Sequence, residues 1–132
     1  MKLRLHLPYD FKASHSLAGY EEPHDHLWRC RFSFEGVPVD GKIADIPSLE
    51  AALRDLVAPL VETYLNENAV LSESTRSFPT CEALASDLFL ALASRIVPGI
   101  RAANPSFRLA GVSVALWDAT GTKEWGTAEV LP

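Results

Sequence analysis

The chain has 132 residues, of which 48% are hydrophobic and 22% charged, and its net charge is −5 at neutral pH. These values predict one compact domain over residues 1–132. Lys and Arg form no cluster and no apolar stretch approaches the roughly 18 residues that span a bilayer, so we expect neither a nucleic-acid surface nor a membrane segment. The N-terminus lacks the apolar core of a signal peptide, and two scattered cysteines predict no disulfide framework, so the expected location is the cytoplasm.

Two segments near the N-terminus alternate between apolar and polar residues. In residues 2–15 the apolar side chains share one parity, and His15 lies on it. In residues 24–35, His24 and His26 share the parity of four further buried-type side chains, which are Trp28, Cys30, Phe32 and Phe34. A period of two predicts β-strands with one buried face, and residues 16–23 predict the loop between them.

The middle of the chain has the spacing of helices. Residues 37–46 predict a turn followed by a short strand, and residues 48–65 predict a helix that is kinked or broken near Pro59. Residues 67–78 are polar and irregular. Thr80 can cap a second helix, and Pro98-Gly99 is expected to end it.

The last third of the chain predicts a closing hairpin. Residues 107–117 and 124–131 read as two strands joined around Gly121. The whole order is therefore strand, strand, helix, helix, strand, strand, which predicts an α+β domain with an antiparallel sheet.

Three histidines lie on the buried faces of the first two predicted strands. Residues two apart on a strand point the same way, with Cβ atoms about 6–7 Å apart, so His24 and His26 can reach one metal ion at about 2.0–2.1 Å. A hairpin of the two strands brings His15 to the same ion. Three protein ligands with a free fourth position are typical of catalytic zinc sites. His6 falls on the solvated face and is interpreted as a surface residue.

Several fragments match, in order, the motifs of one family. Phe11-Lys12-Ala13-Ser14-His15 resembles F-x-A-A-H, His24-Asp25-His26 resembles H-G-H, Gly41-Lys42-Ile43-Ala44-Asp45 resembles G-x-[VI]-x-D, Leu65-Asn66 resembles the end of L-D-H-x-x-L-N, and Pro79-Thr80-Cys81-Glu82-Ala83-Leu84-Ala85 resembles P-T-x-E-x-L-A. Together they resemble the 6-pyruvoyl-tetrahydropterin synthase and 6-carboxytetrahydropterin synthase family.

The resemblance implies a T-fold, in which a four-stranded antiparallel sheet carries two helices on one face. It also implies that three subunits join their sheets into a barrel and that two trimers stack into a homohexamer, with pterin sites at the subunit interfaces. In such a protein, Zn²⁺ is held by His15, His24 and His26 and polarises the side chain of 7,8-dihydroneopterin triphosphate as a Lewis acid. Thr80 aligns with a pterin-contacting position.

The chain departs from the family pattern at its catalytic positions. Tyr20 stands where the family commonly has a catalytic Cys, and Val61 and Glu62 replace its Asp-His pair. Leu116 replaces the Glu that holds the pterin ring and cannot accept its N–H hydrogen bonds. Tyr has a reference pKa of about 10 against about 8.5 for Cys, so Tyr20 is a poor substitute for a thiolate.

Other residues can replace the missing groups. Glu21 lies three residues before His24, as in family variants of the form E-x-x-H-G-H, and becomes the candidate general base beside Tyr20. The resemblance associates that variant with formation of 6-hydroxymethyldihydropterin. Asp118 and Glu124 are the candidate replacements for the pterin-holding Glu.

Three functions remain open from the sequence. The first is a zinc-dependent lyase, or an aldolase-like enzyme, that acts on dihydroneopterin triphosphate or a relative. The second is a catalytically altered T-fold protein that keeps zinc and binds a pterin- or purine-like ligand. The third is a structural oligomer whose histidines only hold the assembly together. Retention of the three histidines favours the first two, and the reactivity of an open three-histidine zinc site favours the first.

Overall fold

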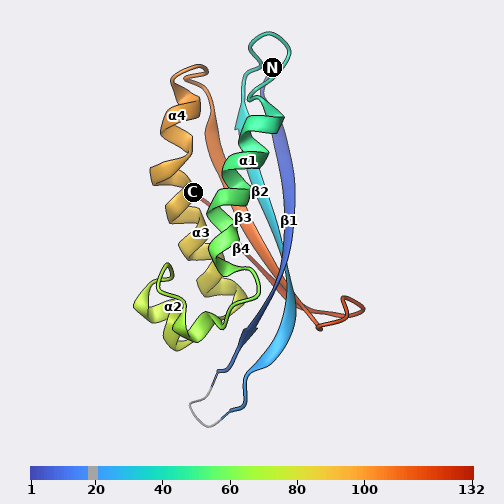
Figure 1. The fold of residues 1–132 in the computed structure, drawn as a ribbon. Helices are drawn as coiled ribbons and strands as arrows, with labels where there is room; N and C mark the ends of the chain where they lie inside the picture. The colour runs from blue at the N-terminus through green and yellow to red at the C-terminus, as the bar shows by residue number, and fades with distance from the viewer. Residues whose placement is uncertain (18–20) are drawn as a thin grey trace.

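The protein is a four-stranded antiparallel sheet with its helices on one face, as the computed structural model shows for residues 1–17 and 21–132 (Figure 1). Each strand pairs with its neighbour in sequence, so β1 and β4 form the two edges. The strands are β1 (Leu3–His15), β2 (His24–Gly36), β3 (Arg108–Trp117) and β4 (Glu124–Val130). This arrangement confirms the predicted α+β architecture and both predicted hairpins.

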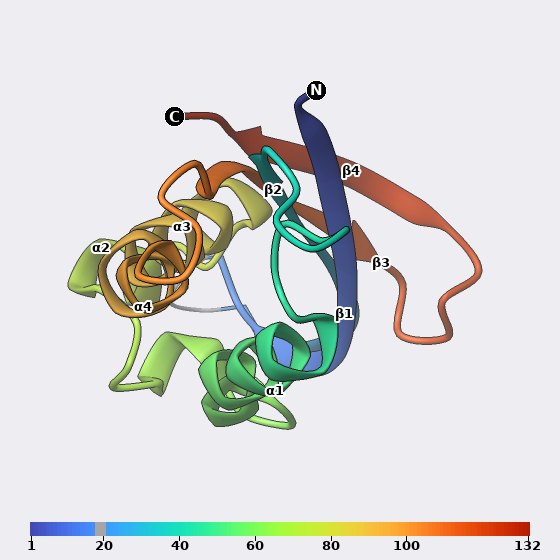
Figure 2. The same cartoon turned by 90° about the horizontal axis from the view of Figure 1, so that it is seen from above.

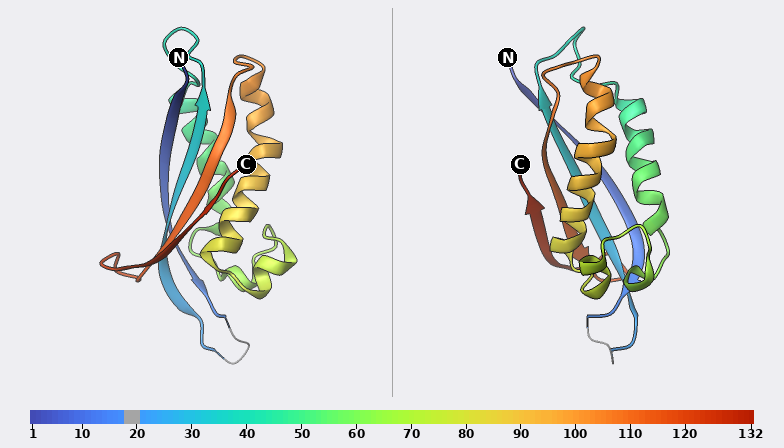
Figure 3. Two further views of the ribbon diagram at one scale, coloured as in Figure 1. Left: turned by 180° about the vertical axis from the view of Figure 1, so that it is seen from behind. Right: turned by 90° about the vertical axis from the view of Figure 1, so that its left-hand side faces the viewer.

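Two long helical segments cover one face of the sheet, which is clear when the molecule is seen from above (Figure 2). The side views show the same layering, with the opposite face of the sheet uncovered by helices (Figure 3). The helices are α1 (Ile46–Val57), α2 (Glu73–Ser77), α3 (Cys81–Arg95) and α4 (Val97–Arg101), with 3₁₀ turns η1 (Ala58–Leu60) and η2 (Leu65–Glu67).

Local chemistry explains where the two long helices begin and where the first of them ends. Asp45 caps α1 by accepting from the backbone N–H of Ser48, and Thr80 caps α3 by accepting from that of Ala83. The helix break expected near Pro59 is present, because α1 ends at Val57 and η1 follows.

The structure differs from the sequence-based expectation at three places. The short strand expected before residue 46 is absent, and only one isolated bridge joins Val39 to Lys42 around the Asp40-Gly41 turn. The irregular segment contains α2. The second long helix, α3, ends at Arg95, before Pro98, and the proline lies in the first turn of the separate helix α4, where its missing N–H is not needed.

The continuous segment Cys81–Arg101 is long and apolar enough to cross a membrane by length and composition, contrary to the expectation above. Its apolar side chains have another use here. Leu84, Leu88 and Leu92 are buried in the core that α3 shares with the sheet. The segment is therefore explained as a core helix, whose apolar side packs on β-strands.

The register of β1 and β2 places the buried parities of both strands face to face. Leu7 lies opposite Phe32 and Phe11 lies opposite Trp28, and all four side chains are buried beneath the helices. The same register continues to the loop end of the hairpin, where His15 lies opposite His24. The core and the strand ends are thus built by one unbroken ladder.

The chain itself covers part of the outer edge of β1. The backbone N–H of Glu62 donates to the carbonyl of Lys12 at 2.7 Å, and the N–H of Ser14 donates to the carbonyl of Thr63 at 3.0 Å. This short parallel contact ties the segment after η1 to the end of β1 that carries His15.

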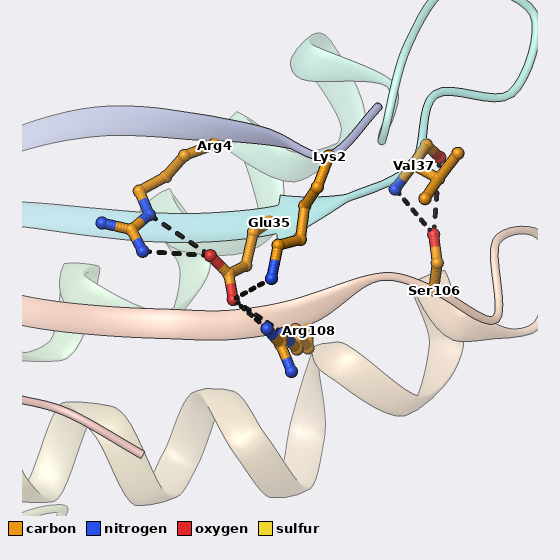
Figure 4. A network of polar contacts seen from close by, with 6 residues as sticks. All are labelled: Lys2, Arg4, Glu35, Val37, Ser106 and Arg108. Atoms are coloured by element: carbon orange, nitrogen blue, oxygen red, sulfur yellow. Dashed lines mark hydrogen bonds and ion pairs between the residues drawn. The ribbon is translucent and has the colours of Figure 1, made fainter.

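Glu35 gathers three cations at the other end of β2, on the face away from the helices (Figure 4). Its carboxylate accepts from Arg4 at 3.0 Å and from Arg108 at 2.7 Å, and Lys2 lies 3.8 Å away. The hydrogen bonds from Arg4, and then those from Arg108, hold the pKa of Glu35 below its ordinary value. The cluster ties β1, β2 and β3 together.

We predict that Glu35→Gln lowers the melting temperature at pH 7 and that this difference disappears in acid. A carboxyl whose pKa is lowered by folding stabilises the protein above its unfolded pKa of about 4.3 and loses that effect as pH falls through the folded pKa. Thermal unfolding of both proteins between pH 7 and pH 2.5 measures it. Glu50→Gln is the control, because Glu50 pairs only with exposed Arg54. A gap that stays constant over this range would contradict the role of Glu35.

Candidate metal centre

Three histidines meet where β1 ends and β2 begins. His15 lies directly opposite His24 in the ladder, and His26 follows on the same face. The ring centroids of His15 lie 4.7 Å from His24 and 4.9 Å from His26, and those of His24 and His26 are 4.9 Å apart. One nitrogen from each ring lies within 4.8 Å of the others. The sequence-based expectation that the loop brings the three imidazoles together is met.

Each histidine uses its Nδ1 atom in a contact with a different part of the chain. Nδ1 of His15 lies 2.7 Å from the carbonyl oxygen of Pro79, and Nδ1 of His26 lies 2.8 Å from that of Trp117. Nδ1 of His24 lies 3.2 Å from Oε1 of Glu21. When Nδ1–H donates to an oxygen, the neutral ring offers its lone pair at Nε2, which is the arrangement that metal-binding histidines use.

The Nε2 atom of His26 supports this interpretation. Within the described residues it is buried and has no hydrogen-bond partner. A buried polar atom without a partner is costly, so its presence calls for an explanation. Coordination of an ion by this lone pair supplies one.

Burial keeps two of the rings neutral. It is the main cause that lowers the pKa of His15 and also that of His26, and in both rings the backbone hydrogen bond opposes it. Neutral imidazole is the form that binds a metal ion.

The end of β1 is held in place by the segment that follows η1. The side-chain amide of Asn66 accepts from the backbone N–H of Ser16 at 2.9 Å and donates to its carbonyl at 2.7 Å. Leu65 beside it is fully buried. These contacts give the Leu65-Asn66 fragment a structural role, because they fix the backbone just after His15.

The cluster fits a small metal ion after a modest closing of the rings. Ligand nitrogens at about 2.1 Å from one tetrahedral ion lie about 3.4 Å apart, whereas the nitrogens here lie within 4.8 Å of one another, so the rings must move closer together. Three imidazoles suit zinc and neighbouring transition metals rather than Mg²⁺ or Ca²⁺, which prefer oxygen.

Of the two candidate catalytic residues, Glu21 lies just before β2 and contacts the cluster. Glu21 is half-buried, with one carboxylate oxygen at His24 and the other accepting from the backbone N–H of Leu17 at 3.0 Å. Tyr20 lies outside the described residues. Thr80 follows Pro79, whose carbonyl contacts His15, so the cap of α3 borders the site.

The two candidate pterin-holding carboxylates lie in different surroundings. Burial lowers the pKa of His26, and of the two carboxylates it is Asp118 whose charge acts on that pKa, by raising it. β3 ends at Trp117, so Asp118 does not continue the strand face of Leu116 as expected but lies in the turn. Its carboxylate accepts from the side chain of Thr122 at 2.6 Å and from the N–H of Thr122 at 2.7 Å, and these bonds lower its pKa to about 2. Glu124 lines a hollow on the opposite, helix-free face of the sheet.

Trp125 was not singled out by the sequence analysis, yet its ring centroid lies 4.8 Å from that of His26. β3 and β4 lose their regular register between Leu116 and Trp117. Strict alternation would place Trp125 on the helix-free face with Thr127, and the bulge turns it to the histidine side. No sequence pattern predicts this.

A cavity of about 580 Å³ lies far from the histidines. It is lined by the segment before α1, by α1 and by the ends of α3 and α4, including Ile43, Leu49 and Ile100. The candidate metal centre lies at the other end of α3, by Pro79, where the side chain of His24 is partly exposed.

The family model of 6-pyruvoyl tetrahydropterin synthase matches residues 4–121. The chain belongs to this family. The resemblance found in the sequence is therefore confirmed, and with it the T-fold of this pterin synthase-like chain. Among curated proteins, none matches the sequence at a significant level.

Solved structures of similar fold span the whole chain. An uncharacterized protein from Wolinella succinogenes has a TM-score of 0.71 at 15% identity, covering 99% of this chain and 98% of its own. The 6-pyruvoyl tetrahydropterin synthase of Caenorhabditis elegans has 0.69 at 14% identity, covering 100% and 96%. A catalytic-residue mutant of the Plasmodium vivax enzyme, with a glutamate replaced by cysteine, has 0.66 at 13% identity, covering 100% and 99%.

We predict that this family member binds about one divalent metal ion per chain through the three histidines. His24→Ala should remove most of it, because two imidazoles hold an ion far more weakly than three. Elemental analysis of desalted protein measures the content. His6→Ala is the matched control, since His6 contacts Ser33 on the other face of the sheet. A full metal content in the His15, His24 and His26 triple alanine variant would rule out the site.

Proposed function

We propose that the protein is a zinc-dependent enzyme of pterin metabolism, a carbon–oxygen lyase acting on 7,8-dihydroneopterin triphosphate or a related pterin. The observation that carries this proposal is the convergence of three imidazoles, whose Nδ1 atoms contact protein oxygens, so that their Nε2 atoms are left for one ion. Family membership supports pterin chemistry of this kind.

Zinc on this site would supply a Lewis acid for the oxygens of the substrate's side chain. The protein's own residues do the rest. His15, His24 and His26 hold the ion, and the carbonyls of Pro79 and Trp117 orient two of the rings.

Glu21 is our candidate for the proton-transfer group. Its carboxylate is about one-third exposed at the edge of the cluster, where a substrate hydroxyl can approach it. A carboxylate is ionised at neutral pH and can accept a proton without a special environment, whereas Tyr20 cannot. The Plasmodium relative, in which the altered catalytic residue is a glutamate, supports the same chemistry here.

A second candidate function is binding without turnover. Leu116 is apolar where the family holds the pterin, and the carboxylate of Asp118 is engaged by its own turn. These features favour a catalytically altered T-fold zinc protein that binds a pterin- or purine-like ligand.

We predict that Glu21→Gln lowers turnover by about 10²-fold or more while zinc stays bound, because Gln keeps the shape of Glu but cannot accept the proton. The assay incubates zinc-loaded protein with dihydroneopterin triphosphate and separates the products by chromatography. Formation of 6-hydroxymethyldihydropterin supports the glutamate route, and a 6-pyruvoyl or 6-carboxy product means that the family's usual reaction is retained.

The controls separate three roles for this loop. Glu22→Gln changes the neighbouring exposed carboxylate and should leave turnover intact. Loss of zinc together with turnover in Glu21→Gln would show that Glu21 only positions His24. Loss of turnover in Tyr20→Phe alone would assign the step to Tyr20. Intact binding of a pterin without any product would select the second function.

We also predict that the protein assembles through its sheet edges, as a trimer or as a hexamer of two trimers. β1 and β4 leave their outer backbone groups unpaired over most of their length, and exposed edges are normally covered. Barrel closure between subunits pairs them. Light scattering at micromolar concentration measures the mass, and a stable monomer of 14.5 kDa would contradict the proposal.

A further inference from the structure

Trp125 is an exposed tryptophan in contact with a buried candidate metal ligand. Its side chain is 60% exposed, whereas His26 is only 2% exposed. The two rings meet at an interplanar angle of 81°, so they touch edge to face. In that geometry His26 leaves at least one face of the Trp125 ring uncovered.

The other two tryptophans lie in different surroundings. Trp28 is fully buried beneath the helices. The ring of Trp117 is covered by the guanidinium of Arg29, 4.3 Å from its centroid, on the helix-free face of the sheet. Trp125 is therefore the tryptophan whose ring is both open to solvent and beside the histidines.

The residue that follows Trp125 on β4 leaves open space beside it. Gly126 lies opposite Leu116 in the ladder, and a Cβ atom added to Gly126 would meet no other atom within 4 Å. A larger residue there would fill the space beside Trp125 and Leu116. The surface next to the metal centre thus has an aromatic ring, an apolar side chain and an open gap.

We propose that Trp125 is the stacking platform for the flat heteroaromatic ring of the ligand, of the pterin or purine type, beside the metal centre. This inference rests on the proposed function and adds how the ring is held. Stacking on an aromatic face binds such rings without a carboxylate. It accounts for recognition in a chain that has Leu116 where the family has a glutamate.

The chemistry of the platform predicts a broad specificity. A carboxylate selects a ring by its N–H pattern, whereas an indole face accepts any flat ring of suitable size. Leu116 adds apolar contact but no hydrogen bond. Neopterin and guanosine should therefore both bind, and their affinities should fall together when the indole is removed.

The test measures binding of neopterin, and separately of guanosine, to zinc-loaded protein by isothermal titration. Trp125→Ala should weaken the affinity for each roughly tenfold or more, and Trp125→Phe should restore most of it, because a flat face returns. Leu90→Ala is the matched control, since Leu90 is 66% exposed on α3 and should leave binding unchanged. Zinc content and light-scattering mass are recorded for every variant.

The outcomes separate this proposal from the one on which it rests. Binding to the unaltered protein that persists at full strength in Trp125→Ala overturns the platform and leaves the proposed function standing. Failure of the unaltered protein to bind either compound overturns both. Loss of zinc or a change in mass in Trp125→Ala shows that the indole supports His26 or a subunit contact, and this also overturns the platform. Weaker binding at unchanged zinc content and mass supports it.

Discussion

The pairing register of β1 with β2 is the constraint on which the site depends. Side chains alternate between the faces of a strand, so a slip of one residue would turn a whole set of side chains to the other face. The pairs that build the core, such as Phe11 with Trp28, belong to the same ladder that sets His15 opposite His24. Burial of the aromatic pairs therefore fixes the position of the histidines, although neither Phe11 nor Trp28 is a candidate ligand.

The surroundings of the three rings come from distant parts of the chain. Pro79 precedes α3, Trp117 ends β3, and Glu21 belongs to the loop after β1. The binding of an ion here would depend on all three of these elements, because each orients one ligand. A site of this kind exists only in the folded chain, so a bound metal ion would add to the stability of the fold.

Much of the fold could be predicted because its strands are buried on one face and alternate cleanly. The histidines share that alternation, and their convergence could be predicted from the same pattern. Asp118 was misplaced because the end of β3 depends on the turn that its own carboxylate organises. Trp125 was missed because a bulge reverses its face, and bulges leave no periodic signal. Pro98 lies in the first turn of the separate helix α4, and the sequence did not predict this because a proline at a helix start is as acceptable as one after a helix end.

The contact between the segment after η1 and the end of β1 has a consequence for how copies of the chain can meet. It occupies the outer edge of β1 at Lys12 and Ser14, so an added strand can align only with the part nearer the N-terminus. That stretch is comparable in length to β4, which has 7 residues. The segment after η1 thus limits how far an incoming strand can slide along β1. A pairing of defined register favours a closed ring of subunits over open-ended fibrous growth.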